Sequence, residues 1–234
     1  MKKIICYFLI IMFCFGCTPL IVSATEEMSD NILEEHYKDI SRRKSEAHDT
    51  AERIRAMGYD ESHPTIVKAK EKWWEAEKEF LYYKSFENKM EEYPDATTIW
   101  IYLHDEGFND YACAGIIGNM MVECGDLTLN IIPERYGTYN TNYYGICMWY
   151  GVYYPDVFGM SLYEQLEFLM SNIKYEIDTF GYLYYQGFTY DTFLTLNNVW
   201  ETTMSFCKSY ERCYSDSYQF RVDCAYTAYD YFVN

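Results

Sequence analysis

Two runs of apolar residues, each with a spacing of three and four, constrain the first part of this chain most strongly. The first run comprises Leu33, Tyr37, Ile40, Ala47, Ala51 and Ile54, and the second comprises Ile66, Ala69, Trp73, Ala76, Phe80 and Tyr83. This spacing predicts two helices that pack through a coiled-coil seam. Ser29 or Asp30 can cap the first helix, which is expected to end near Met57. The break GYDESHP (58–64) ends in Pro64, which suits the first turn of the second helix, and so short a turn predicts an antiparallel hairpin.

The composition changes at Tyr93-Pro94-Asp95. Residues 25–93 are charged and contain no cysteine, whereas residues 94–234 are rich in aromatic side chains and cysteines. We therefore expect a helical arm over 25–93 and a second domain over 94–234. The arm has two interpretations: a spacer that packs on the second part, or a surface for a protein partner or for self-association.

Five segments of the second part have a helical pattern. Thr97 or Thr98 can cap the first segment, which Gly107 ends, and Asn109 can cap the second, which ends near Gly125. Ser161 and Glu164 predict a capping box for the third, and the last two are expected over 191–210 and 217–232. The stretch 126–155 lacks this pattern and predicts turns and a short hairpin. The fold class is therefore mainly α, with an irregular or β-hairpin insert.

The first 24 residues have the pattern of a secretory signal. Lys2 and Lys3 precede an apolar segment over 4–15, and small residues end at Ala24, where we expect cleavage. The alternative is a lipid anchor on Cys17. No later stretch has the length and apolar character of a membrane span, so we expect a secreted protein associated with the cell wall.

The net charge and the cysteines restrict the partners. The formal net charge is −17, which makes nucleic acid an unsuitable partner because phosphate binding needs a basic face. No cysteine spacing is typical of a zinc site, and we expect neither a metal nor a cofactor. An even number of cysteines in an exported chain predicts disulfides, with the pairing left open. The candidates are Cys113, Cys124, Cys147, Cys207, Cys213 and Cys224.

Glu123 ends an otherwise apolar helical segment. On a helical wheel it shares one face with Ile116 and Met120, so apolar surroundings are expected to raise its pKa. Such a carboxyl can stay protonated near neutral pH and act as a general acid. The alternative is a helix-end residue that reaches solvent. Small residues, Gly118 among them, would allow another segment to approach this helix closely.

Several motifs in order resemble the phage tail lysozyme family, within the lysozyme and lytic transglycosylase superfamily. They are IWIYLHDEGFNDYACAGIIGNMMVECGDLT (99–128), YYGICMWY (143–150), LYEQLEFLMSNI (162–173) and CKSYERC (207–213), followed by a final helix that contains Arg221 and Ala225. The resemblance covers about residues 97–232. It implies a lysozyme-like helical domain that cleaves the β-1,4 bond between N-acetylmuramic acid and N-acetylglucosamine in the glycan strands of peptidoglycan.

The resemblance also implies roles for individual residues. Glu123 falls on the catalytic acid of the family, and Gly145 and Trp149 fall on the segment that lines the sugar groove. We extend the candidate substrate-binding residues to the neighbours of these positions. The full set of substrate-binding candidates is Asn119, Tyr143, Tyr144, Gly145, Met148 and Trp149.

Two departures from the family pattern affect this prediction. Met148 replaces a glutamine that could bind substrate, and Cys124 replaces a serine. A second carboxylate is not evident either: Tyr143 stands where animal-type lysozymes have an aspartate, and Asp126 and Glu134 are only near in sequence. A single glutamate acting as acid and then base is therefore favoured, with a transglycosylase-like or a muramidase outcome.

Two other functions remain as alternatives. One is a domain that has lost catalysis and acts as a wall-binding or docking module. The other is a cysteine hydrolase that uses Cys113 as nucleophile and His104 as base.

Overall fold

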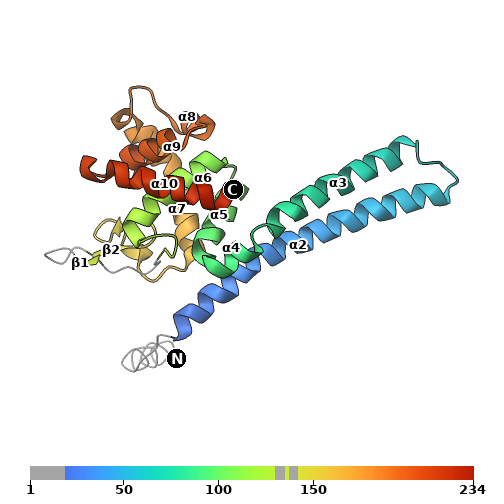
Figure 1. Cartoon of the computed structure of the whole chain (residues 1–234), viewed down its shortest axis with the longest axis horizontal. Coiled ribbons are helices and arrows are strands. Elements are labelled where there is room, and N and C mark those ends of the chain that lie inside the picture. The colour runs from blue at the N-terminus through green and yellow to red at the C-terminus, as the bar shows by residue number, and fades with distance from the viewer. Residues whose placement is uncertain (1–18, 130–134, 137–141) are drawn as a thin grey trace, which may run out of the picture. The chain divides into compact units, whose positions relative to one another are not determined.

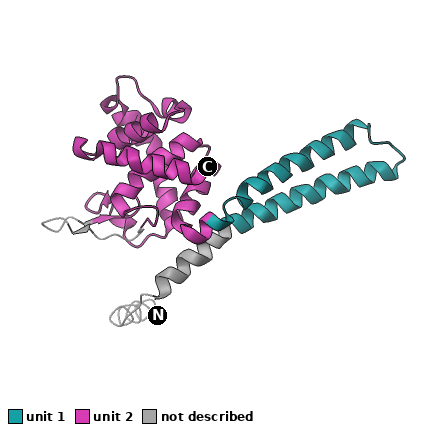
Figure 2. Ribbon diagram, in the orientation of Figure 1, with its two compact units in different colours: residues 1–88 teal, residues 89–234 magenta. Residues whose placement is uncertain are grey.

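The computed structural model describes the backbone of residues 19–129, 135–136 and 142–234, and the side chains of these ranges from residue 32 onward except at 135, 136 and 142. Figure 2 colours its two compact units, residues 1–88 and residues 89–234. Most of the predicted signal segment, residues 1–18 with Cys17, lies outside the described residues. Among the helices that are described, none combines the length and the apolar character that crossing a bilayer requires.

The first unit is a hairpin of two long helices, α2 (Pro19–Ala56) and α3 (Pro64–Lys84) (Figure 1). This confirms the antiparallel hairpin, although α2 begins well ahead of the predicted cap at Ser29 or Asp30. Pro64 occupies the first turn of α3 as predicted. The seam residues that become buried are Leu33, Ile40, Ala47 and Ala51 of α2 and Ile66, Ala69, Ala76 and Tyr83 of α3.

Charged side chains cross the edge of this seam. Arg43 Nη2 lies 2.6 Å from Glu79 Oε1, and Lys44 pairs with Glu77 while its Nζ sits 4.5 Å from the centre of the Trp73 ring. These pairs are partly buried; exposed pairs contribute about 0–1 kcal/mol each. The apolar seam therefore stabilises the hairpin more than these pairs do.

The second unit is mainly helical, as predicted. Asn109 caps α6 by accepting a hydrogen bond from Ala112 N at 2.9 Å, and Ser161 and Glu164 form the predicted capping box of α7. Its helices are α4 (Glu87–Glu92), α5 (Pro94–Asp105), α6 (Asp110–Cys124), α7 (Leu162–Phe180), α8 (Tyr190–Thr195), α9 (Val199–Phe206) and α10 (Tyr218–Val233). Short 3-10 turns lie at Pro155–Val157, Gly181–Leu183 and Ser215–Ser217, and a π-helical turn at Cys207–Glu211.

Two details of the helices differ from the sequence prediction. Thr97 and Thr98 do not cap α5, which begins at Pro94; both are buried inside it, and Thr97 Oγ1 donates to Lys89 O at 2.9 Å. The helix expected over 191–210 is divided into α8 and α9. Asn198 begins the second of these by accepting a hydrogen bond from Glu201 N at 3.1 Å, a local contact that competes with continuing the first helix.

The irregular insert contains a small antiparallel sheet. Its strands are β1 (Arg135–Tyr136), β2 (Asn142–Tyr144) and β3 (Trp149–Tyr150), in that order. Tyr144 pairs with Trp149 and Tyr143 with Tyr150, so a tight turn brings the YYGICMWY motif back on itself.

Helix α6 is the buried centre of this unit and packs against α5, α9 and α10. Most of its apolar side chains are buried, and Ile116 and Met120 have no exposed surface. Gly118 explains how α10 comes so close, because a Cβ at this position would lie 2.5 Å from the backbone of Ala225. The close approach predicted from the small residues of this helix is therefore present, and it places α10 beside the last turn of α6.

Candidate functional site

Glu123 lies in the last turn of α6, and its side chain is 18% exposed. Its Oε1 contacts Nη2 of Arg221 from α10, whose side chain is only 5% exposed. The carboxyl therefore does not face an apolar wall, as the helical wheel suggested. It faces a buried guanidinium that fixes its position and compensates its negative charge.

Asn119 holds the guanidinium in place. Arg221 Nη1 donates to Asn119 Oδ1 at 3.1 Å, and Asn119 Nδ2 donates to Gly115 O at 2.8 Å and to Thr203 O at 3.1 Å. Asn119, which the sequence placed among the substrate-binding candidates, is fully buried and supports Arg221.

The YYGICMWY motif forms a wall of aromatic side chains. Trp149 and Met148 are buried, whereas Tyr143 is 37% exposed and stacks on Tyr150 with ring centres 5.1 Å apart. Exposed aromatic rings of this kind suit the apolar faces of sugars. Tyr144 packs on Phe158 at 4.9 Å.

Gly145 makes the turn between the two strands. Its φ is +79°, and a Cβ there would lie 2.6 Å from Gln165 Oε1 and 2.9 Å from the Trp149 ring. Gln165 in turn accepts a hydrogen bond from Ile146 N at 2.9 Å. The absence of a side chain at Gly145 therefore allows Gln165 of α7 and the indole of Trp149 to pack directly against the turn.

A chain of hydrogen bonds links this wall to the segment after α9. Trp149 Nε1 donates to the Tyr210 hydroxyl at 3.0 Å, and that hydroxyl donates to Asn172 Oδ1 at 2.7 Å. Tyr210 precedes Glu211 in the π-helical turn. The position of Glu211 is thus tied to Trp149.

Glu211 is a second carboxyl near Glu123. Its Oε1 is buried and has no hydrogen-bond partner among the described residues. Burial, followed by the nearby carboxyl of Glu123, raises the pKa of Glu211 from its usual 4.5 to about 8. Arg221, Cys147 and Arg212 act in the opposite direction. Glu211 therefore favours its protonated form at neutral pH.

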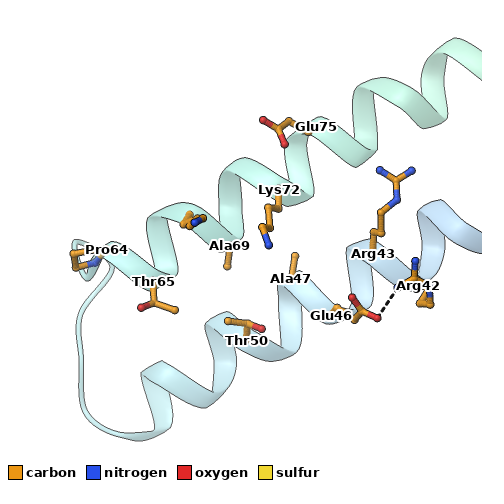
Figure 3. A pocket seen from close by; sticks show the side chains of 11 residues that line it. Arg42, Arg43, Glu46, Ala47, Thr50, Pro64, Thr65, Ala69, Lys72 and Glu75 are labelled. Carbon is orange, nitrogen blue, oxygen red and sulfur yellow. Dashed lines mark hydrogen bonds and ion pairs between the residues drawn. The ribbon is translucent and has the colours of Figure 1, made fainter. Parts of the chain in front are cut away.

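A cavity of about 240 Å³ lies between the aromatic wall and this segment. Glu211 lines it directly. Glu123 does not line it, but the next residue, Cys124, contacts Gly145 and Ile146 in the turn that leads to the lining residues Cys147 and Trp149. The other residues that line it are Tyr143, Cys147, Met148, Trp149, Tyr150, Tyr153, Tyr154, Asn172, Glu176, Tyr210 and Arg212. A larger hollow of about 780 Å³ belongs to the arm: Figure 3 shows Ala47 and Ala69 on the facing sides of its two helices, with charged side chains such as Lys72 around them. That hollow lacks the aromatic lining of the first cavity.

Of the two carboxylates considered from the sequence as partners of Glu123, only Asp126 lies among the described residues. Asp126 is exposed and accepts a hydrogen bond from Thr128 N at 2.8 Å, which, with the Thr128 side chain, lowers its pKa. Glu134 lies outside the described residues.

The cysteines are arranged differently from a fully paired set. Cys207 and Cys213 form a disulfide with Cα atoms 5.7 Å apart, and this bond spans the turn that contains Glu211. Cys113, Cys147 and Cys224 are buried free thiols. Cys124 Sγ lies 3.4 Å from the carbonyl oxygens of Gly145 and Ile146, and so connects the end of α6 to the aromatic wall.

The structure offers no support for the cysteine hydrolase. Cys113 is fully buried, and its burial raises the pKa of the thiol well above the usual value, which disfavours the reactive thiolate. Nε2 of His104 lies 3.0 Å from Asp110 Oδ1. Within the described ranges no three His, Cys, Asp or Glu side chains are grouped so as to hold a metal ion.

Sequence reasoning did not assign roles to Glu211, Tyr210 or the guanidinium of Arg221. A charged residue between two cysteines in CKSYERC was the available signal for Glu211. Arg221 gave a weaker one, since it is a basic residue on a helix whose neighbours Val222 and Ala225 are buried.

Comparisons with known proteins agree with this arrangement at the level of the family. The family model described as phage tail lysozyme matches residues 94–232, which is more than half of the chain. Comparisons with curated proteins and with solved structures gave no match. Glu123, the aromatic turn and Arg221 all lie inside the matched range. The chain belongs to the phage tail lysozyme family, and its second unit is a lysozyme-like domain of the kind that acts on peptidoglycan.

Proposed function

We propose that this protein is an exported peptidoglycan glycosidase. It cleaves the β-1,4 bond between N-acetylmuramic acid and N-acetylglucosamine, and Glu123 is its catalytic carboxyl. The observation that carries this proposal is the contact between Glu123 and Arg221 at the exposed end of α6. It holds one carboxyl in a defined position, one residue before the Cys124 that contacts the aromatic turn, in a domain of the lysozyme type.

In the proposed reaction Glu123 acts first as acid and then as base. Its protonated form gives the proton to the glycosidic oxygen, the bond between C1 and that oxygen breaks, and the leaving sugar keeps the electron pair. The ionised carboxyl then takes a proton from the attacking hydroxyl. Attack by the 6-hydroxyl of the muramic sugar gives a 1,6-anhydro end, and attack by water gives a reducing end.

The aromatic wall supports a sugar ligand. Tyr143 and Tyr150 stack on each other at the mouth of the cavity, and Tyr153 is 76% exposed. Sugar rings present C–H groups on one face, and flat apolar rings bind such faces while their hydroxyls remain hydrated. We infer that these tyrosines position the glycan strand.

Digestion of purified peptidoglycan tests the proposal. We expect the wild type to release muropeptides, Glu123→Gln to release none, and Glu167→Gln, a change of an exposed glutamate on α7, to behave like the wild type. Product masses distinguish anhydro ends from reducing ends. If the wild-type protein binds peptidoglycan without cutting it, the glycosidase proposal is wrong and the wall-binding module is favoured.

For the arm we propose self-association through an apolar stripe on α3. Val67, Trp74 and Leu81 recur every seven residues, so they lie on one face of the helix, and they are 40%, 60% and 57% exposed. Lysines and glutamates lie beside this stripe, at Lys70, Glu71, Glu75 and Lys78. The apolar stripe, and not these charges, is the feature that supports a second copy of the same helix as its partner.

A further inference from the structure

The Glu211 carboxyl has no part in the reaction described above. It ends the π-helical turn Cys207–Glu211, and the residue lines the aromatic cavity of about 240 Å³. The thiol of Cys147 interacts with this carboxyl, but Oε1 itself is buried and has no hydrogen-bond partner among the described residues. A buried polar atom without a partner destabilises a fold. A ligand that supplies the missing partner is therefore expected to bind here.

Three other polar side chains that line the same cavity satisfy one another. Trp149 Nε1 donates to the Tyr210 hydroxyl at 3.0 Å, and that hydroxyl donates to Asn172 Oδ1 at 2.7 Å. Asn172 Nδ2 donates to Phe168 O at 2.8 Å. Of these four described lining side chains, Glu211 is the one that keeps a buried oxygen without a partner. The capacity for a new hydrogen bond in this wall therefore lies at Glu211.

The two arginines near Glu211 have other carboxylates as partners. Arg212 Nη1 lies 2.6 Å from Glu176 Oε2 on α7, and Arg221 Nη2 contacts Glu123 Oε1 on α6. A desolvated carboxyl without an ion partner of its own favours its neutral form. Burial is the main reason why the pKa of Glu211 is raised to about 8. The neutral carboxyl offers one O–H donor and one carbonyl acceptor at the same place.

An acetamido group matches both the carboxyl and the aromatic lining of this cavity. Its C=O and N–H are an acceptor and a donor side by side, which complement the donor and the acceptor of a protonated carboxyl. Its methyl group is apolar and suits the flat rings of Trp149, Tyr150 and Tyr154, which line the cavity. An ammonium group would instead need the ionised carboxylate, which burial disfavours. The glycan proposed as substrate has an acetamido group on each of its sugars.

We propose that Glu211 is a specificity-determining residue that recognises the acetamido group of one sugar of the glycan strand. Glu211 donates a hydrogen bond to the acetamido carbonyl oxygen and accepts one from the acetamido N–H, while the aromatic rings hold the methyl group. No covalent bond forms or breaks at Glu211. This inference rests on the proposed function, because it concerns the substrate of the same site.

Titration with N-acetylglucosamine and with glucosamine, followed by NMR, tests the inference without cleavage, because neither sugar contains a glycosidic bond. We expect the wild type to bind N-acetylglucosamine about tenfold more tightly or better, since glucosamine cannot make the two buried hydrogen bonds. The indole N–H signal of Trp149 should shift. That of Trp200, which is 47% exposed on α9 and does not line the cavity, should stay in place. Equal affinities for the two sugars, or tighter binding of glucosamine, would overturn the inference.

Two replacements of Glu211 separate recognition from a structural role. Glu211→Gln keeps a donor and an acceptor at the same place, so its preference for N-acetylglucosamine should stay within about threefold of the wild type. Glu211→Met removes both and should weaken the binding of N-acetylglucosamine about tenfold, with little change for glucosamine. Glu167→Met, the same change at an exposed glutamate of α7, should leave both affinities unchanged. A Glu211→Met variant that keeps the preference, or a Glu211→Gln variant that loses it, would contradict the proposed recognition.

Digestion of peptidoglycan before and after chemical removal of its acetyl groups separates this inference from the proposed function. We expect the wild type to cut the N-acetylated wall about tenfold faster or more, and Glu211→Met to lose most of this difference. If the wild type binds N-acetylglucosamine through Glu211 but releases no muropeptides, the proposed function fails and the recognition stands. If it cuts both walls equally fast, the recognition fails and the glycosidase stands.

Discussion

Arg221 of α10 contacts the carboxylate of Glu123 across the packing of α6 and α10, and the two residues are 98 positions apart in the chain. The contact connects the candidate site to the buried core, because the same guanidinium also donates a hydrogen bond to Asn119 inside the core.

Replacing Arg221 tests how strongly the fold depends on this contact. Arg221→Met should lower the free energy of unfolding by about 3 kcal/mol, because it leaves the Glu123 carboxylate and the Asn119 amide without their buried partner. Arg221→Lys keeps the charge but loses the forked geometry, so its loss should be smaller. Urea unfolding followed by circular dichroism measures both. Equal stability of Arg221→Met and wild type would contradict the supporting role of the contact.

The close approach of α6 and α10 at Gly118 leads to a second prediction. In Gly118→Ala the added Cβ would lie 2.5 Å from Ala225 atoms, so one helix must shift. We expect a loss of about 1–3 kcal/mol in unfolding free energy, together with reduced cleavage because Arg221 moves with α10. Thr227→Ala, a change on the exposed side of α10, should stay within about 0.5 kcal/mol of the wild type. Thermal unfolding is the measurement, and a fully stable Gly118→Ala would contradict the packing.

The disulfide gives a third prediction. Changing both Cys207 and Cys213 to alanine opens a loop with a sequence separation of 6 residues, which should cost about 2 kcal/mol. A reducing agent should lower the melting temperature of the wild type toward that of the double variant. It should leave the melting temperature of the double variant itself unchanged, and a drop there would point to another bond. Cys224→Ala, which removes a free thiol, should retain the sensitivity to reduction.

Glu211 gives a prediction about stability and pH. Its pKa is raised to about 8 in the folded protein, against about 4.5 in the unfolded chain, so the folded state binds more protons between these values. The stability that Glu211 contributes is therefore complete below about pH 4.5 and is lost as the pH rises through about 8. Relative to Glu211→Gln, the wild type should lose stability over this window. Parallel stability curves of the two proteins would count against a raised pKa.

Self-association of the arm is tested by light scattering after gel filtration. Changing Trp74 and Leu81 together to glutamate should convert an oligomer to a monomer, because it places charge on the apolar stripe. Changing the exposed Lys68 and Lys72 to glutamine should not. A wild type that is monomeric at all concentrations would exclude a second copy as the occupant of this face.

Local patterns predicted the secondary structure well where the cause is local. The Ser161–Glu164 capping box, the cap at Asn109 and the three-four seam of the arm all depend on residues within one or two turns of each other, so the spacing in the sequence is sufficient. The division between α8 and α9 was missed because Asn198 competes with a helical pattern that otherwise continues.

The site was predicted only in part, for a different reason. Glu123 and the aromatic turn are recognisable from their motifs. The partners of Glu123 are not, since Arg221 and Glu211 come from segments about a hundred and about ninety residues away, and no periodicity states which side chains of remote helices meet. The apolar helical wheel gave the wrong surroundings for Glu123 because a wheel shows one helix without the charge that a neighbouring helix brings to it.

The disulfide Cys207–Cys213 closes the turn that contains Glu211. In reducing surroundings the same chain has two thiols there, and the turn is held only by its packing and hydrogen bonds. The position of Glu211 is thereby linked to the compartment in which the chain folds. A chain with the function proposed above would therefore have this turn closed by a covalent bond only in an oxidising compartment.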